Sequence, residues 1–484
     1  MGGFGTQARV AALTLVCALF IDAALAPSCA RRLEARRVST ADTFGSATFT
    51  SVTFLTPFDV TPVVVSLATD QGGDSSALRI RNVTTTGFEI AALEPPGNDG
   101  PHVSMDIDYI AMEPGSLVLP GGETVVAGFH TTSSVQRAGV VGGPAAFDTV
   151  SFGAALSSNA AVIASIQTMN SESGAPPGGP SQPWLTVAIR NPSTTDVEMA
   201  LERSEVAAGT VSAETIGYLA FPSGASGSFV DTGSTVIAWE ATQSPDSIVG
   251  FDNSCVTTPF TTSSFPNARV VATKNSRDGG DGGWLRRCAL TASQIGLQVD
   301  EDVANDSERA HTNEIAGILA FSDTFHAMFT GVLSAVKSVT IEEDPVNGAS
   351  GALAVPGARA RYAVDIESSG NSPTDNDSVV FVDALPAETS LVVADIAPGA
   401  GPVLFTDGTP SSALTYTFAG LGAVSDDISF SNDNGATFAY TPTPDANGAD
   451  PNVTHIRVEP KGSFAEQTTS ASPNFRLEFD VLVE

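Results

Sequence analysis

The chain has 484 residues and a formal net charge of −32, from 54 acidic and 22 basic residues. This length predicts more than one hydrophobic core, and a negative field of this size excludes nucleic acid and anionic lipid surfaces as expected partners while leaving divalent cations. With 45 Gly and 30 Pro, and without a long stretch of helical period, the composition favours strands joined by turns. We therefore expect an all-β protein.

The first thirty residues are typical of a secretory signal peptide. Residues 10–20 form an apolar run that follows a basic residue and precedes the small residues at positions 24–26. The run is too short to span a bilayer, so we expect no stable membrane span. We predict a signal peptide over residues 1–30, cleavage after Ala26 or Ala30, and an extracellular or cell-surface location.

A repeated pattern then occupies the chain to about residue 330. Phenylalanine pairs of identical separation begin each copy, at Phe49/Phe54, Phe147/Phe152 and Phe260/Phe265. Each pair is followed by an apolar strand, a polar Gly-rich loop, a further strand, and a closing segment that ends in Ala-Met or Ala-Phe. The period of two and the frequent turns predict antiparallel β-sandwiches over residues 38–135, 140–245 and 250–332, each folding alone like a bead.

The first copy, from Phe49 to Pro114, resembles the H-type lectin domain of invertebrate agglutinins and some secreted bacterial proteins. The residues that carry the resemblance are Val52-Thr53-Phe54, Pro62-Val63-Val64-Val65, Arg79, Thr86-Gly87-Phe88-Glu89 and Ile107-Asp108-Tyr109-Ile110-Ala111. The resemblance implies a six-stranded antiparallel sandwich, association into trimers or other homo-oligomers, and binding of galactose-type sugars. Residues 94–100 contain no aromatic side chain where that family usually presents one.

Residues 336–484 are similar to the immunoglobulin-like repeat of bacterial surface proteins. The similarity rests on Val355-Pro356-Gly357-Ala358, Tyr362-Ala363-Val364-Asp365-Ile366, Asp383-Ala384-Leu385-Pro386 and Val453-Thr454-His455-Ile456-Arg457-Val458. It implies a spacer or connector outside the cell. Independently of the family, Asn434-Gly435 predicts a hairpin, because this dipeptide tolerates positive φ at both positions.

Cys255 and Cys288 are the two cysteines that lie beyond the predicted signal peptide. Export permits a disulfide between them, and the alternative is a pair of buried free thiols. Closing a loop of this length would stabilise the fold by about 3–4 kcal/mol. A metal site is not expected, because neither cysteine has a second Cys or a His at ligand spacing.

Four residues are candidates for ligand binding. Trp184 and Trp284 each follow a polar loop and could stack on a sugar ring, although bulky rings that begin a strand more often fill a sandwich interior. Arg79 belongs to the lectin-like pattern, and His102 occupies a loop before a closing strand. For His102, a surface loop position is the alternative to a ligand contact.

Calcium is a candidate cofactor, and otherwise none is expected. Asp70 and Asp74 lie in one Gly-rich loop, and Asp278 and Asp281 lie in another, where carboxylate and carbonyl oxygens could hold the ion. Turn chemistry alone also explains Asp and Gly in such loops, and we favour that interpretation.

The sequence favours a non-enzymatic binding or adhesion protein with an extracellular glycan or surface component as partner. The 5 histidines accompany no nucleophile elbow, no zinc-binding His pair and no phosphate loop. A structural surface or assembly protein without a glycan ligand is the main alternative. A polysaccharide-acting enzyme with paired carboxylates is a second alternative, and we do not expect it.

Overall fold

The structure is a computed structural model that describes residues 30–43, 49–95, 98, 102–136, 146–172, 183–203, 209–261, 264–280, 282–303, 307–467 and 471–484. Nearly all of the predicted signal peptide lies outside these residues. Every helix or strand assigned within them is a strand, which confirms the all-β prediction. Across the same ranges, no helix has the length and apolar character needed to cross a membrane. The chain forms two compact units, Arg31–Met328 and Phe329–Glu484.

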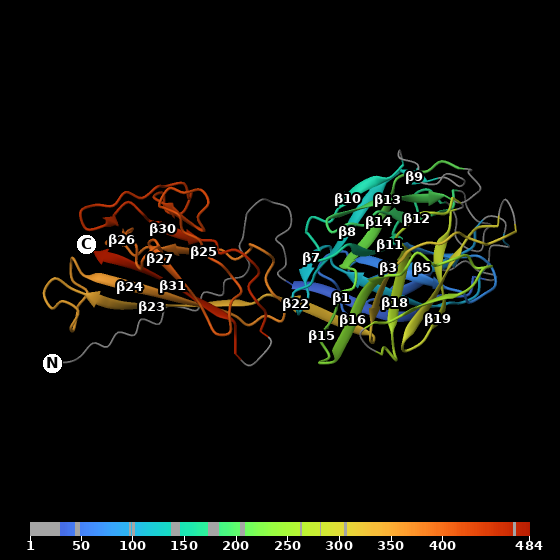
Figure 1. The fold of residues 1–484 in the computed structure, drawn as a ribbon, viewed down its shortest axis with the longest axis horizontal. Coiled ribbons are helices and arrows are strands. Elements are labelled where there is room, and N and C mark those ends of the chain that lie inside the picture. Colours follow the sequence, from blue (N-terminus) through green and yellow to red (C-terminus); the bar gives the residue numbers. More distant parts are fainter. Residues whose placement is uncertain are drawn as a thin grey trace. The chain divides into compact units, whose positions relative to one another are not determined.

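The first repeat of the N-terminal unit is a sandwich of two antiparallel layers (Figure 1). One layer has the order β2-β5-β4, and the other contains β3, β6 and β1. Side chains of both layers share one buried cluster around Phe54, Phe88 and Tyr109. The bounds are β1 Ala30–Ser39, β2 Thr50–Thr53, β3 Val63–Thr69, β4 Ala77–Arg81, β5 Gly87–Leu93 and β6 Asp106–Met112.

The second and third repeats use the same strand order. In the second, β10-β13-β12 faces β11-β14-β8-β7, and β9 adds to β13; in the third, β17-β20-β19 faces β18-β21-β16-β15. The bounds in the second are β7 Gly115–Val118, β8 Thr124–Thr132, β9 Val135–Gln136, β10 Asp148–Ser151, β11 Ala160–Ile166, β12 Leu185–Arg190, β13 Asp196–Arg203 and β14 Glu214–Pro222. Those in the third are β15 Ser226–Val230, β16 Val236–Gln243, β17 Val256–Pro259, β18 Arg269–Lys274, β19 Trp284–Leu290, β20 Gln294–Asp300 and β21 Ala316–Phe321.

Strand pairing moves the boundaries between repeats from those predicted. Strands β7 and β8 fall within the predicted first sandwich, 38–135, but β8 pairs with β14 of the second. Likewise β15 and β16 fall within 140–245, but β16 pairs with β21 of the third. The last strand of the series, β22 (Phe325–Thr330), pairs with β1 at the start of the chain and closes the three repeats into a ring.

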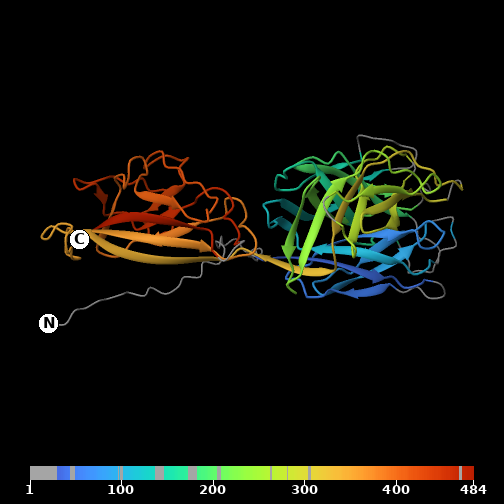
Figure 2. The same ribbon diagram turned by 60° about the horizontal axis from the view of Figure 1, so that its bottom comes forward.

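The three repeats are not beads, because equivalent strands meet at the centre of one compact unit. Strands β3, β11 and β18 contact one another pairwise, and Figure 2 shows the blue first repeat beside the green and yellow strands of the other two. In each of the three strands, one backbone N–H group donates a hydrogen bond to a side chain of another repeat. Val64 N donates to Gln167 Oε1 (3.3 Å), Val162 N to Asn275 Oδ1 (2.9 Å) and Val270 N to Asp108 Oδ2 (3.2 Å).

Strand pairing aligns the third repeat with the other two differently from the predicted alignment of the phenylalanine pairs. Phe54 N donates to Thr86 O and Phe152 N to Thr195 O, and the equivalent bond in the third repeat runs from Phe260 N to Ser293 O. Phe260 is thus the second phenylalanine of the pattern, and Phe265 is the counterpart of Phe58 and Leu156. The residue that replaces Phe49 and Phe147 is Cys255, because residues 256–259 pair with β20 as residues 50–53 pair with β5.

The C-terminal unit is also a two-layered β-structure (Figure 1). One sheet has the order β23-β24-β31-β26-β29 with β27 on β31, and the other is β25-β30-β28. The predicted turn occurs at Asn434 (φ 60°) and Gly435 (φ 81°), between the paired Phe430 and Tyr440. The bounds are β23 Leu333–Glu343, β24 Arg359–Ser368, β25 Phe381–Ala384, β26 Thr389–Val392, β27 Val403–Asp407, β28 Ile428–Ser431, β29 Ala449–Asp450, β30 His455–Val458 and β31 Asn474–Val483.

Candidate functional site: an open cleft between the first and third repeats

The predicted ligand residues come together, but inside the N-terminal unit. Trp184 and Trp284 have ring centroids 5.9 Å apart, and the Arg79 guanidinium lies 4.0 Å from the Trp184 ring. Trp184, Trp284, Arg79 and His102 are each at most 7 % exposed. The aromatic rings therefore fill the interior, and a sugar could not stack on them without opening the fold.

Polar bonds hold Arg79, Trp284 and His102 in the interior. Arg79 donates to both carboxylate oxygens of Glu172 in the second repeat, at 2.6 and 2.7 Å. Trp284 Nε1 donates to Ser76 O at 2.9 Å, and the His102 ring lies 3.2 Å from Ser76 Oγ. The His102 contact lies within the first repeat, but the Arg79 and Trp284 bonds connect different repeats, so these side chains join the repeats rather than presenting a surface.

The predicted calcium residues do not form a site among the residues that the structure describes. No group of three or more His, Cys, Asp or Glu side chains there is arranged to hold a metal ion. Asp70, Asp74 and Asp278 are exposed on loops, and burial together with the charge of Glu314 raises the pKa of Asp278. Asp281 lies outside the described residues.

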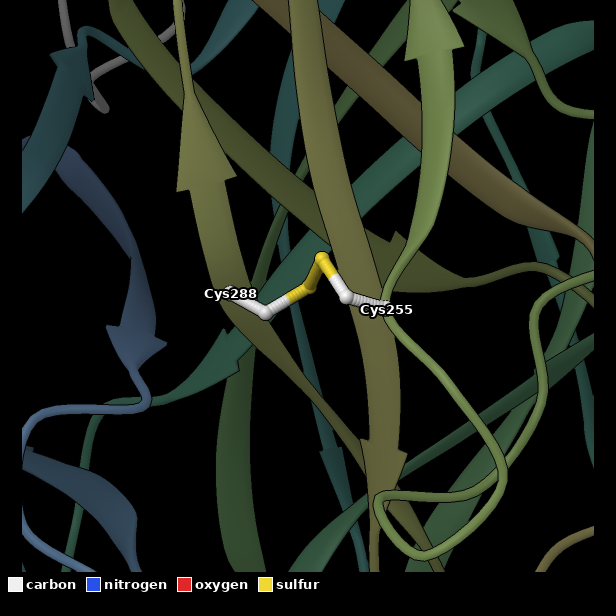
Figure 3. Close-up of a disulfide and its surroundings, with 2 residues drawn as sticks. All are labelled: Cys255 and Cys288. Carbon is white, nitrogen blue, oxygen red and sulfur yellow. A yellow bond between two sulfur atoms is a disulfide. The ribbon is translucent and has the colours of Figure 1, made fainter.

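The predicted disulfide between Cys255 and Cys288 is present (Figure 3). Cys288 lies in β19, and Cys255 directly precedes β17 at the edge of the same sheet. Cys255 is exposed, and Cys288 is partly buried.

An open cleft of about 510 Å³ lies between the first and third repeats. Its size suits a small ligand. The first repeat contributes Arg37, Asp70, Gln71 and Asp106, and the third contributes Asn267, Arg269, Arg287 and the wall from Cys288 to Ala292. Of the predicted site residues only Asp70 and Cys288 line it, so the sequence interpretation missed this cleft.

Beneath the lining residues Arg37 and Arg287 lies the fully buried carboxylate of Asp108. Arg37 donates two bonds to it (2.8 and 2.9 Å), and Arg287 Nη1 donates a third (2.7 Å). Hydrogen bonding to Asp108 raises the pKa of Arg37, whereas burial lowers the pKa of Arg287. The hydrogen bonds to Asp108 orient both guanidinium groups. Arg37 uses Nε and Nη2 for its bonds, and its Nη1 donates to no protein acceptor in the described residues.

The cleft occurs where the third repeat departs from the other two. Arg287 pairs with Leu297 at the position where Ile80 pairs with Ile90 and Ile189 with Met199. Arg269 replaces Val63 and Ala161, since all three oppose the equivalent residues Phe321, Met112 and Phe221. Ile80 and Ile189 lie in the apolar cores of their own repeats. Two charged residues thus replace apolar ones. In the sequence, the sign of this change is Arg287 in Arg286-Arg287-Cys288, at the position where the other two copies have Ile80 and Ile189.

The charges around the cleft cancel. Three arginines and three aspartates border or underlie it: Arg37, Arg269, Arg287, Asp70, Asp106 and Asp108. Guanidinium groups donate hydrogen bonds and carboxylates accept them, so the cleft can satisfy a ligand that both donates and accepts, such as a polyhydroxylated molecule. Comparison of the chain with known protein families, with curated proteins and with solved structures gave no match.

Proposed function

We propose that this is an exported, non-enzymatic binding protein that takes a neutral saccharide in the cleft between its first and third repeats. The single observation that carries the proposal is the open, charge-balanced cleft, lined by arginine, aspartate, asparagine and glutamine side chains. A net charge of −32 opposes an anionic ligand at long range. Because arginines and aspartates balance around the cleft, a charged ligand of either sign gains no net attraction there, and a neutral saccharide needs none.

The lectin-like resemblance of the first repeat supports the same ligand class. The immunoglobulin-like resemblance of the C-terminal unit supports a spacer role for residues 336–484, and the signal peptide supports a position outside the cell. A structural surface protein without a ligand remains the competing function, and the binding experiment below separates the two.

The test is a glycan-array screen of the mature chain, followed by calorimetric titration of the best saccharide. Asn267→Ala removes an exposed amide from the cleft rim, and Asp70→Ala removes an exposed carboxylate. Since each lost hydrogen bond costs about 0.5–1.5 kcal/mol, we expect binding to weaken about two- to tenfold in each variant.

Asn159→Ala is the matched control, because Asn159 is exposed at the equivalent position of the second repeat, which lies outside the cleft. It should bind like the unaltered chain. Absence of binding to every glycan, together with ordered self-association, would favour the structural function instead. Release of reducing ends from bound polysaccharide would mean that the protein is an enzyme with paired carboxylates, and would overturn the non-enzymatic proposal.

A further inference from the structure

We infer that the Cys255–Cys288 disulfide is a positioning element of the cleft, which holds the end of β19 so that Arg287 reaches Asp108. The inference rests on the proposed function for its binding readout. Its structural part concerns only the backbone around Arg287 and is measured separately.

The disulfide bridges two strands across a third. The sheet order is β17-β20-β19, so the link from Cys255, next to β17, to Cys288 in β19 passes over β20 (Figure 3). Gly296 of β20 lies beneath it, and a Cβ there would come within 2.6 Å of Cys255 Sγ. Only glycine leaves the sulfur atoms this space, so the residue at 296 is matched to the disulfide.

The first two repeats fill the equivalent positions in a different way. The Arg81 guanidinium lies 3.6 Å from the Phe49 ring and pairs with Glu89, and Arg190 lies 4.1 Å from Phe147 and pairs with Glu198. In the third repeat, Cys255 replaces the phenylalanine and Gly296 the glutamate. Cys288 follows Arg287 as Arg81 follows Ile80, but the pairing places Ala289 opposite Gly296. These changes go together, and they occur in the repeat that contributes Arg269 and Arg287 to the cleft.

The strand also has a different register in the third repeat. The pairing of β19 with β20 shifts between Arg287 and Ala289, whereas the pairings of β4 with β5 and of β12 with β13 are regular. A bulge bends a strand and redirects its side chains, and the bulged residue here is Cys288 itself. The covalent link therefore fixes the irregularity that follows Arg287.

The backbone of Arg287 transmits this position to the first repeat. Arg287 O accepts a bond from Asp70 N at 3.0 Å, and Arg287 pairs in parallel with Thr69 of β3. Arg287 Nη1 then reaches Asp108 at 2.7 Å. A β19 end that is free to straighten would loosen this wall of the cleft, because Cys288 and its neighbours up to Ala292 line it.

The experiment compares the full mature chain with Cys255→Ser/Cys288→Ser. Amide hydrogen exchange is measured at Asp70, whose N–H bonds to Arg287 O, and at Val64 and Val162, which report on the other two junctions. We expect exchange at Asp70 to accelerate at least tenfold while Val64 and Val162 change less than twofold. Affinity for the best saccharide of the array should fall at least tenfold.

A second variant guards against a chain that fails to fold. Cys255→Ala/Cys288→Ala keeps Gly296, where an added Cβ would come within 2.8 Å of Ala289 Cβ, so it should fold yet lose saccharide affinity. Unchanged exchange at Asp70 in both variants, or equal acceleration at all three amides, would overturn the inference. If the unaltered chain binds no saccharide, the proposed function fails, and the exchange measurement still decides the role of the disulfide.

Discussion

Asp108 shows how single buried charges hold the N-terminal unit together. Its carboxylate is fully buried and accepts bonds from two arginines and from Val270 N. Asp108→Asn would remove the carboxylate charge to which Arg37 and Arg287 donate their hydrogen bonds, and Arg287 is largely buried. We expect a loss of about 3 kcal/mol or more, measured by urea unfolding of the N-terminal unit.

The matched control is Asp365→Asn, because Asp365 and Arg476 form an exposed pair with side chains 43 % and 47 % accessible. An exposed pair contributes about 0–1 kcal/mol. Similar losses in the two variants would contradict a special role for Asp108.

The pH dependence of stability should follow a buried histidine between two carboxylates. Burial lowers the pKa of His311, but its hydrogen bonds to Glu301 and Glu314 outweigh this and raise it above 6.5. The stabilisation is therefore complete below about pH 6.5 and is lost as the pH rises through the folded pKa. Burial opposes the charged form of Glu314 as well, yet Lys274 and His311 hold its pKa at about 2.

For Glu314 the sign is opposite. Its contribution is present above its ordinary pKa of 4.5 and is lost as the pH falls towards 2. We expect His311→Gln to flatten the alkaline decline in the unfolding free energy of the N-terminal unit, measured from about pH 3 to 9. His455→Gln in the C-terminal unit is the control. An unchanged alkaline slope in His311→Gln would contradict this assignment.

At the scale of the elements, the central strands depend on side chains from another repeat. These side chains form the backbone hydrogen bonds that a neighbouring strand would otherwise provide. Asn275 accepts a bond from Val162 N at 2.9 Å and donates one to Val162 O at 2.7 Å. Asn275→Ala leaves both backbone groups buried and unsatisfied, so we expect a loss of about 2–3 kcal/mol. Chemical unfolding measures it, and the exposed Asn267→Ala should lose less than about 0.5 kcal/mol. Equal effects would mean that water satisfies Val162.

The pairing of β22 with β1 closes the ring of three repeats. Strand β22 follows the third repeat but pairs with β1 of the first, so the two ends of the N-terminal unit stabilise each other. In each of the other repeats, a strand from the preceding segment occupies this place: β7 beside β8 and β15 beside β16. The pairing covers the outer edge of β1, which would otherwise be open to other chains.

For the whole molecule, the packing predicts cooperative behaviour within the N-terminal unit. The three repeats share junctions built from Arg79–Glu172, Arg277–Glu202 and the arginines on Asp108. We expect calorimetry of the mature chain to show one transition for Arg31–Met328 and a separate one for Phe329–Glu484, since these are the two compact units.

A fragment of residues 31–222, which lacks the third repeat, should not unfold cooperatively, because Glu202 would lose its partner Arg277 and β1 would lose β22. Three separate transitions within the N-terminal unit, or a stable fragment 31–222, would contradict this view and restore independent repeats.

The sequence by itself determined the strands, the turn at Asn434-Gly435 and the existence of three related copies. These features follow from local chemistry: the period of two and the φ preference of Asn-Gly. For Cys255 and Cys288 the sequence left a disulfide and two free thiols as alternatives, and the structure shows the disulfide. The lectin-like and immunoglobulin-like resemblances and the location outside the cell stay predictions.

Only the tertiary structure decided which residues form contacts between the repeats and where each repeat begins and ends. Trp184 and Trp284 have the same sequence pattern whether they face a sugar or another repeat, and the loops from 70 to 76 read as turns although they contact the third repeat. Boundaries moved for the same reason, since a strand such as β8 pairs with residues about ninety positions away. Alternation records that a face is buried, but the partner that buries it comes from long-range packing. The cleft depends on that packing most of all, because its arginines and aspartates come from the first and third repeats, which are far apart in the sequence.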